Sequence, residues 1–214
     1  MPKPMKIEMI SDVICPWCVI GLRELERALE RMTDVVAAEL HFQPYELAPG
    51  RAVDGEKITD IYQTHFGKSF GEMAAQREMV RTRGANVGVA INMTEDSRIY
   101  NTFDAHRLLH WAALKGKQLP MKHALFTAHF TDGKNIADYD VLAELAESAG
   151  LDKAEALKVL DDGLYADDVR KAERHWQSAG VRSVPGFVID GKHFISGGQT
   201  ADVFEKMLRQ VAAA

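Results

Sequence analysis

The two cysteines of this 214-residue chain, Cys15 and Cys18, stand in one Cys-Pro-Trp-Cys motif, and its setting constrains the fold more than any other feature. The preceding segment 6–10 is short and apolar and ends at a Ser-Asp turn signal, which predicts a strand. After the motif, apolar residues recur at steps of three and four up to Met32, which predicts a helix. The motif therefore lies where a strand passes into a helix, with Pro16 at the first helical position, where a missing N–H is harmless.

Both ends of the chain predict an α/β frame. Segment 40–43 alternates apolar and polar residues and stops at a proline, which predicts a second strand. Segments 186–189 and 192–195 flank an Asp-Gly pair, so we expect a β-hairpin with a two-residue turn of the primed type. A last helix is expected from about Thr200, because the apolar residues that follow keep the helical period.

The middle of the chain contains hardly any strand pattern and many helical ones. Helices are predicted at 100–115, 120–130, 138–149, 152–160 and 167–179, with a glycine close to the end of most of them. We therefore expect an inserted helical domain over about 49–166. The frame would comprise 1–48 and 181–214, together with the helix at about 167–179.

Composition excludes several classes of partner. The formal net charge is −5, with no basic region of the kind that a phosphate backbone requires, so we expect no nucleic-acid partner. No apolar stretch approaches the roughly 18 residues that would span a bilayer, and no secretory signal is evident. These features predict a cytoplasmic protein with no membrane partner, in a compartment where thiols are kept reduced.

The motif itself predicts thiol chemistry. Free N–H groups and the helix dipole favour a thiolate at a helix N-terminus, and two cysteines one turn apart can close a small disulfide ring. We predict Cys15 as the nucleophile and Cys18 as the resolving thiol. Trp17 carries no positive charge of the kind that a histidine would place between the cysteines, so we expect a weaker oxidant than a CPHC-type site.

A zinc site and an inert core pair are the alternative roles for the two cysteines, and the sequence disfavours both. Half of a zinc site would need a second C-x-x-C, which is absent, or further ligands, and His106 and His110, which are four residues apart, lack a third. We therefore predict no metal. Inert core thiols are disfavoured because a Pro-Trp pair at a helix start is a poor place to bury them.

Four segments together resemble a known family. They are 11–18 (SDVICPWC), 42–47 (FQPYEL), 101–108 (NTFDAHRL) and 181–189 (VRSVPGFVI). In this order they are similar to the FrnE branch of the DsbA-like thiol-disulfide oxidoreductases. The resemblance covers nearly the whole chain and implies a thioredoxin-like fold with a large inserted all-helical domain.

The resemblance also implies roles for individual residues. Pro185 would be a cis proline beside the motif and part of the catalytic site, and the backbone of Ser183 and Val184 would pair with an extended substrate. A proline that simply begins the following strand stays an alternative. Trp17 is predicted to contact substrate as well.

Three further kinds of side chain have two interpretations each. His106 either lines the substrate cleft that faces Cys15 or packs in the interior. Asp12, three residues before Cys15, is either a candidate proton relay for Cys18 or an ordinary turn residue. Three scattered methionines, Met73, Met79 and Met93, either soften a substrate groove or fill the core.

The predicted function is that of a cytoplasmic dithiol-disulfide oxidoreductase, acting as a reductase or isomerase by mixed-disulfide exchange. It needs no cofactor, with glutathione as a candidate reductant or co-substrate. Its partners would be proteins, peptides or small molecules that contain a disulfide, and the oligomeric state is left open, a homodimer included. One alternative is a glutathione-dependent isomerase or kappa-class-like transferase. Another is a non-catalytic redox-sensing or chaperone-like binding protein.

Overall fold

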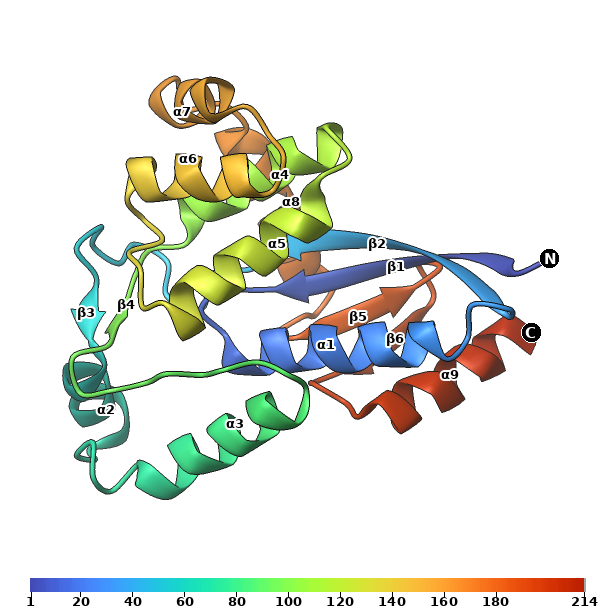
Figure 1. Ribbon diagram of the computed structural model, residues 1–214, viewed down its shortest axis with the longest axis horizontal. Coiled ribbons are helices and arrows are strands. Elements are labelled where there is room, and N and C mark those ends of the chain that lie inside the picture. Colours follow the sequence, from blue (N-terminus) through green and yellow to red (C-terminus); the bar gives the residue numbers. More distant parts are fainter. Residues whose placement is uncertain (214) are drawn as a thin grey trace.

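The computed structural model describes residues 1–213 and has a four-stranded sheet at its centre (Figure 1). Its strands are β1 (Lys3–Ser11), β2 (Val36–Pro44), β5 (Gly186–Ile189) and β6 (His193–Ser196). They lie in the order β2-β1-β5-β6, with β1 parallel to β2 and antiparallel to β5, and with β5 antiparallel to β6. Strand β1 is thus central.

The side chains of β1 show why it is buried on both faces. Met5, Ile7 and Met9 alternate along the strand and belong to the largest apolar cluster of the frame. Ile10 points to the other face, where it packs with Trp176. Because both faces of the strand are apolar, both must be covered by helices.

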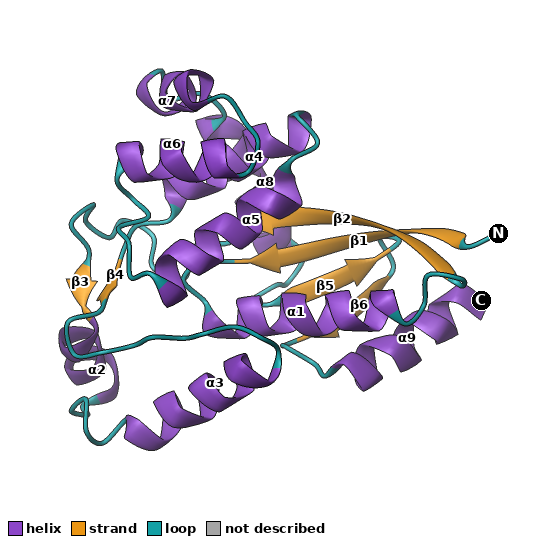
Figure 2. Ribbon diagram, viewed as in Figure 1, coloured by secondary structure: helices purple, strands orange, loops and turns teal. Residues whose placement is uncertain are grey.

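Helices cover both faces of the sheet. Helices α1 (Pro16–Glu30) and α9 (Ala201–Ala213) pack against each other on the face that holds Met5 and Ile7 (Figure 2). Helix α8 (Ala166–Ser178) packs on β2 and brings Trp176 to the other face. The predicted combination of an α/β frame with a large helical insertion is confirmed.

The larger part of the insertion is a group of helices with an apolar core of its own. It contains α4 (Phe103–Leu114), α5 (Gln118–Phe126), the π-helical turn η1 (Thr127–Thr131), α6 (Tyr139–Ser148) and α7 (Lys153–Asp161). Helix α5 also packs on β2. Phe126 and Phe130 join the apolar cluster of the frame, so the insertion packs directly on the sheet and its helices.

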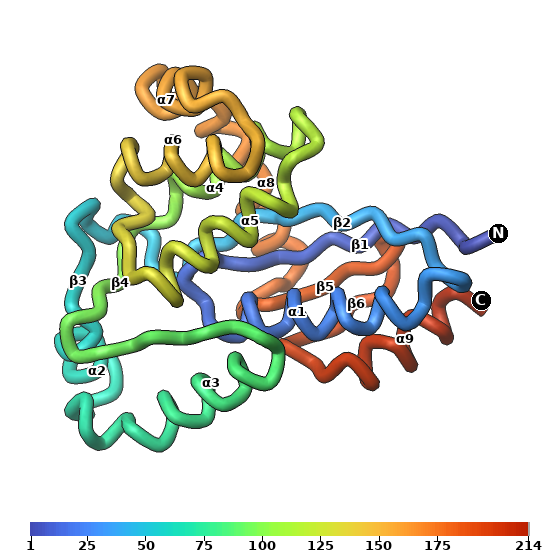
Figure 3. The backbone as a smooth tube through the Cα atoms, in the orientation of Figure 1, coloured from blue at the N-terminus to red at the C-terminus, as the bar shows by residue number. Residues whose placement is uncertain are grey.

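A smaller part of the insertion lies beyond the N-terminal end of α1. It contains α2 (Ile58–Phe66), α3 (Ala74–Asn86) and a two-stranded ladder of β3 (Glu56–Lys57) with β4 (Arg98–Ile99). After α3 the chain turns back and runs to β4 (Figure 3). Helix α3 packs against α1, so this part lies beside the cysteine motif.

Most predicted elements have a counterpart, and the differences have physical reasons. The segment predicted as one helix over 120–130 is α5 followed by η1, because its last turn has π-helical geometry. The short ladder was not predicted, because two-residue strands have no readable period. Helix α2 was not predicted either. The division of the chain into a frame and a domain over 49–166 stays a prediction.

The predicted hairpin is present, but Ile189 pairs with His193, so the loop has the three residues 190–192 and not the predicted two, and β6 begins one residue later than expected. Within the loop, the Lys192 N–H donates to the Ile189 carbonyl at 3.0 Å. Asp190 and Gly191 have φ angles of 49° and 68°. Positive φ at both central residues is what a type I′ turn requires.

The lengths of the helices show whether any of them could cross a membrane. Helix α1, the longest in the described part of the chain, has 15 residues. Within residues 1–213, no helix combines the length and the apolar character that crossing a bilayer requires.

Candidate active site

Cys15 and Cys18 lie at the junction of β1 and α1. Cys15 is the N-cap of α1, with an extended backbone (φ −88°, ψ 114°), and Pro16 is the first residue of the helix. The carbonyl oxygen of Cys15 accepts hydrogen bonds from the N–H groups of Cys18 at 3.0 Å and Val19 at 3.4 Å. The start of the helix therefore holds the two cysteines one turn apart.

The two thiols have pKa shifts in opposite directions. A hydrogen bond from the Cys18 thiol lowers the pKa of Cys15, and the N–H groups of Cys18 and Trp17 also lower it, against the opposing effects of burial and of the Asp12 charge. Burial is the main cause that raises the pKa of Cys18 well above its ordinary value. These opposite pKa shifts suit a nucleophilic Cys15 and a protonated Cys18.

Both cysteines are buried, although we predicted that a Pro-Trp pair at a helix start would be a poor place to bury them. Cys15 is 4% exposed and Cys18 is 0% exposed, and both pack in the apolar cluster of the frame. Burial suits a resolving thiol, which has only to reach its neighbour. For Cys15, it restricts the directions from which a substrate disulfide can approach.

One side of Cys15 faces the segment before β5. The Cys15 sulfur lies 3.8 Å from the carbonyl oxygen of Val184, and the Val184–Pro185 peptide bond is cis. Val184 is half-buried and Ser183 is exposed. The structure thus brings the 183–185 segment to the motif, although the roles of its residues in catalysis and substrate binding stay predictions.

Helix α1 approaches this segment closely at Gly21. A Cβ atom there would lie 3.3 Å from Cγ of Pro185 and 3.2 Å from Cα of Gly198. Contacts that short are tight, so the missing side chain of Gly21 lets α1 pack against the segments that contain Pro185 and Gly198.

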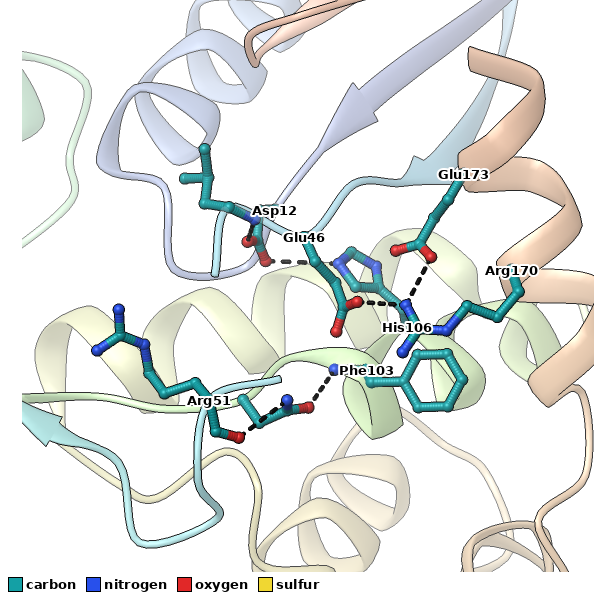
Figure 4. Close-up of polar contacts among 9 residues, drawn as sticks. Asp12, Glu46, Arg51, Phe103, His106, Arg170 and Glu173 are labelled. Atoms are coloured by element: carbon teal, nitrogen blue, oxygen red, sulfur yellow. Dashed lines mark hydrogen bonds and ion pairs between the residues drawn. The ribbon is translucent and has the colours of Figure 1, made fainter. Parts of the chain in front are cut away.

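Asp12 is buried beneath the motif and has two partners (Figure 4). One carboxylate oxygen accepts a hydrogen bond from the N–H of Leu47 at 2.7 Å, and the other lies 3.4 Å from Nε2 of His106. Burial acts to raise the pKa of Asp12, but the neighbouring His106 ring and the Leu47 N–H outweigh it and lower the pKa. Asp12 is therefore held as an anion.

The two histidines that stand four residues apart have different neighbours. His106 is buried and faces Asp12, whereas the ring of His110 lies 5.1 Å from the ring of Tyr165. Among residues 1–213, no three His, Cys, Asp or Glu side chains are grouped as a metal ion would need.

A comparison with models of protein families identifies the family to which this chain belongs. The model of the DSBA-like thioredoxin domain matches residues 6–209, a range that includes the cysteine motif, the helical insertion and the 183–185 segment. The chain belongs to this DsbA-like family. The predicted thioredoxin-like fold and the thiol-disulfide oxidoreductase class are thereby confirmed, whereas the finer assignment to the FrnE branch stays a prediction.

Three individual proteins illustrate what the chain is similar to. The uncharacterized Bacillus subtilis (strain 168) protein YwbO is 30% identical over 203 residues, 94% of each chain. The crystal structure of a probable DsbA oxidoreductase from Streptomyces coelicolor is 35% identical, with a TM-score of 0.91 over 98% of this chain and 90% of that one. The cytosolic disulfide reductase DsbM from Pseudomonas aeruginosa shares the fold at 19% identity, with a TM-score of 0.62 over 98% of this chain and all of DsbM.

This DsbA-like protein has a buried lysine that the sequence did not single out. Lys122 on α5 is 0% exposed, and its ammonium group has no hydrogen-bond partner within the described residues. It lies 5.7 Å from the ring centre of Phe42 and 4.9 Å from that of Phe126. A signal was present, because Lys122 stands three residues before Leu125 and four before Phe126, on the apolar face of its helix.

Burial determines the protonation of Lys122. It lowers the pKa of this lysine to about 8, and the charges of Cys18, Asp12 and Cys15 oppose the shift in that order of size. The charges of the DsbA-like motif and of Asp12 therefore act on Lys122 without a direct hydrogen bond to it.

A partly exposed arginine joins the insertion to the frame. Arg170 on α8 pairs with Glu46 after β2 and with Glu173 at 2.8 Å, and its guanidinium lies 3.8 Å from the ring centre of Phe103 on α4 (Figure 4). Burial raises the pKa of Glu46 despite Arg170. These contacts hold α4, which carries His106, against the end of β2.

A groove opens beside the cysteine motif of the DsbA-like chain. Its volume is about 330 Å³. Pro16 and Trp17 form one wall, and α2 and α3 form the other, with Tyr62, Phe66 and Met73 among the lining residues. Met93 lines it too, whereas Met79 is exposed outside it and Met73 also packs in a buried apolar cluster with Ile58 and Tyr62. No sequence signal indicated that α2 would supply the aromatic wall.

Proposed function

We propose that the protein is a dithiol-disulfide oxidoreductase that works through Cys15 and Cys18 by mixed-disulfide exchange. The observation that supports this best is the position of Cys15, a thiol with a lowered pKa at the N-terminus of α1 that accepts a hydrogen bond from its own resolving thiol. Membership of the DsbA-like family supports the same chemistry.

The proposed reaction has two steps. The Cys15 thiolate attacks one sulfur of a substrate disulfide, a Cys15–substrate bond forms, and the other substrate sulfur leaves with the bonding electron pair. Cys18 then loses its proton and attacks the Cys15 sulfur, which releases the second substrate thiolate and leaves an oxidised Cys15–Cys18 pair. The substrate is reduced by two electrons.

The groove next to Trp17 provides an approach for substrate. Since Cys15 is nearly buried, we propose that an extended substrate lies against Ser183 and Val184 while an apolar side chain near its disulfide enters the groove between Trp17 and α2. Partners of this kind are exposed or partly unfolded protein segments and peptides that contain a disulfide.

The proposed direction is reduction or isomerisation in a reducing cytoplasmic compartment. Trp17 places no positive charge between the cysteines, so we expect a reduction potential well below the roughly −120 mV of the strongest dithiol oxidants. A fold relative, the cytosolic reductase DsbM, has been solved with GSH, and glutathione is the reductant that we propose to test first. A resident cofactor is not part of the proposal.

A set of cysteine variants tests the proposal, helped by the fact that the chain has two cysteines in all. With insulin as substrate and glutathione as reductant, Cys15→Ser should abolish disulfide reduction. Cys18→Ser should accumulate a covalent mixed disulfide on Cys15, which mass spectrometry detects. Turnover by Cys15→Ser would refute the mechanism, and one-for-one binding without turnover by the unaltered protein would favour a redox-sensing role instead.

A further inference from the structure

Asp12 and Cys15 are the two ends of one tight turn. The N–H of Cys15 donates a hydrogen bond to the carbonyl oxygen of Asp12 at 3.3 Å, across the buried residues Val13 and Ile14. The Cα atoms at the ends of such a turn lie within about 7 Å of each other. Asp12 is 0% exposed and Cys15 is 4% exposed. A charge on Asp12 therefore acts on Cys15 with little screening by water.

The counter-group of the Asp12 carboxylate comes from the inserted helix α4. One carboxylate oxygen accepts the N–H of Leu47 at 2.7 Å, and the other lies 3.4 Å from Nε2 of His106 (Figure 4). The second contact has the distance of an ion pair without the geometry of a hydrogen bond. His106 is 3% exposed, so the pair is buried as a whole. A buried carboxylate is costly unless its charge is paired, and His106 is the side chain placed to pair with it.

Helix α4 is anchored on both sides of His106. On one side, the ring of Phe103 lies 3.8 Å from the guanidinium of Arg170 on α8. On the other side, Arg107 is buried and its Nε donates a hydrogen bond to the carbonyl oxygen of Leu164 at 2.8 Å. These contacts hold the imidazole ring against the carboxylate.

The charge of Asp12 works against the proposed nucleophile. A carboxylate beside a thiol disfavours the thiolate, because two negative charges then lie close together. Asp12 has this effect on Cys15 and acts to raise its pKa. A protonated imidazole on the far oxygen of the carboxylate offsets part of that effect.

We propose that His106 is a positioning residue of the dithiol site, which pairs with Asp12, offsets the charge of that carboxylate and so favours the Cys15 thiolate. The inference rests on the proposed dithiol mechanism, in which the thiolate is the attacking species. It gives the inserted helices a part in that mechanism, and it requires no contact between His106 and substrate.

Other charged or titratable groups near the pair come from several elements. They are Cys18 of α1, Glu46 after β2, His110 of α4, Lys122 of α5, His129 of η1, and Arg170 and Glu173 of α8. A test of the proposal must therefore isolate the Asp12–His106 pair from these groups. A double-variant cycle does so, because all of them stay in place in every variant.

The cycle consists of Asp12→Asn, His106→Gln and the two exchanges together. The measurement is the pH midpoint for alkylation of Cys15 by iodoacetamide in the fully reduced protein, followed by mass spectrometry. For His106→Gln we expect a higher midpoint, with alkylation below the midpoint slowed by about tenfold, as a shift of about one pH unit implies. For Asp12→Asn we expect a lower midpoint, because the negative charge is gone.

The decisive comparison is the effect of His106→Gln in the Asp12→Asn protein. If His106 acts through the charge of Asp12, the second exchange leaves the midpoint where Asp12→Asn put it. An equal shift in both backgrounds would mean a merely structural role and would overturn the proposal, as would an unchanged midpoint in the single variant His106→Gln.

His110→Gln is the matched control. It removes a histidine one turn further along α4, whose ring lies 5.1 Å from that of Tyr165, and should leave the midpoint of Cys15 unchanged.

Asp12→Asn keeps the proposal testable even if His106→Gln does not fold. Asparagine has the same shape as aspartate, and its amide oxygen can still accept the N–H of Leu47. A midpoint that does not fall in this variant would overturn the proposal, because the carboxylate would then have no effect on Cys15. Failure of the proposed function is distinguishable, since alkylation reports on Cys15 itself, whereas that failure would appear as an unaltered protein that reduces no insulin.

Discussion

The sulfur of Cys15 lies 3.8 Å from the carbonyl oxygen of Val184, a residue 169 positions further along the chain. The contact joins the start of α1 to the segment before β5, and it directs the sulfur toward the backbone against which we propose that substrate lies. The Cys18 thiol is a second neighbour, and its hydrogen bond lowers the pKa of Cys15. These neighbours lead to the first prediction.

Removing the Cys18 thiol should raise the pKa of Cys15, because its hydrogen bond is the main cause that lowers this pKa. We expect Cys18→Ala to be alkylated by iodoacetamide more slowly than the unaltered protein at neutral pH, with the midpoint of the rate–pH profile moved upward. Cys18→Ser keeps a hydrogen-bond donor and should move it less. A lower midpoint in the alanine variant would contradict this account.

The groove beside Trp17 should determine preference among substrates. Phe66 lines it and is 57% exposed, so Phe66→Ser removes an apolar surface with little effect on folding. We expect KM to rise about tenfold for a peptide disulfide with a neighbouring aromatic residue, as a loss of about 1.4 kcal/mol implies. KM for a small polar disulfide should not change.

Leu114→Ser is the matched control for the groove. Leu114 is an apolar residue that is 64% exposed at the end of α4 and outside the groove. If both variants changed KM for the aromatic peptide equally, the groove would not be the binding site.

Lys122→Met should stabilise the protein. The unfolded chain keeps the ammonium proton up to about pH 10.5, whereas the folded protein releases it near pH 8. The free-energy cost of burying the charged ammonium group is therefore fully present at neutral pH, and it disappears as the pH rises from about 8 to 10.5. The shift corresponds to about 3 kcal/mol.

Urea unfolding at several pH values measures this effect. At pH 7 we expect the midpoint of Lys122→Met to lie above that of the unaltered protein, and the rise in stability above about pH 8 to be absent. Lys117→Met, which removes an exposed lysine just before α5, should behave like the unaltered protein. A less stable Lys122→Met would mean that the charge of Lys122 contributes more to the core than its burial costs.

His129 should make the protein sensitive to acid. Burial lowers its pKa from 6.5 to about 4, so the unfolded state binds a proton between these values that the folded state does not. The contribution of neutral His129 to the free energy of unfolding is fully present above about pH 6.5. It is lost as the pH falls toward 4, by about 3 kcal/mol in total. His129→Gln should reduce this loss in acid unfolding, whereas the exposed His65→Gln should not. An equal loss in all three proteins would exclude His129 as the cause.

Local sequence signals predicted much of the frame and the position of the two cysteines. A short apolar strand, a proline at the first helical position and an apolar stripe are interactions between near neighbours, so they can be read without the fold. The same holds for the Asp-Gly turn. Helix α2 was missed because Ile58 and Tyr62 alone give too weak a period.

The site could be predicted only where its chemistry is local. The roles proposed for Cys15 and Cys18 follow from a helix N-terminus, which the sequence specifies. The burial of Lys122 does not, because it arises only when α5 packs on β2. Asp12 and His106, both proposed from the sequence, face each other in the interior rather than in an open cleft.

The amino-acid sequence by itself determined the dithiol at a strand-to-helix junction, the helical insertion and the hairpin. Tertiary structure alone decided how far Cys15 is covered, which groove borders it and which buried charge acts on Cys18. The physical reason is that capping, periodicity and turn preference act over a few residues. Burial and the electrostatics that follow from it depend on which distant segments exclude water from the same place.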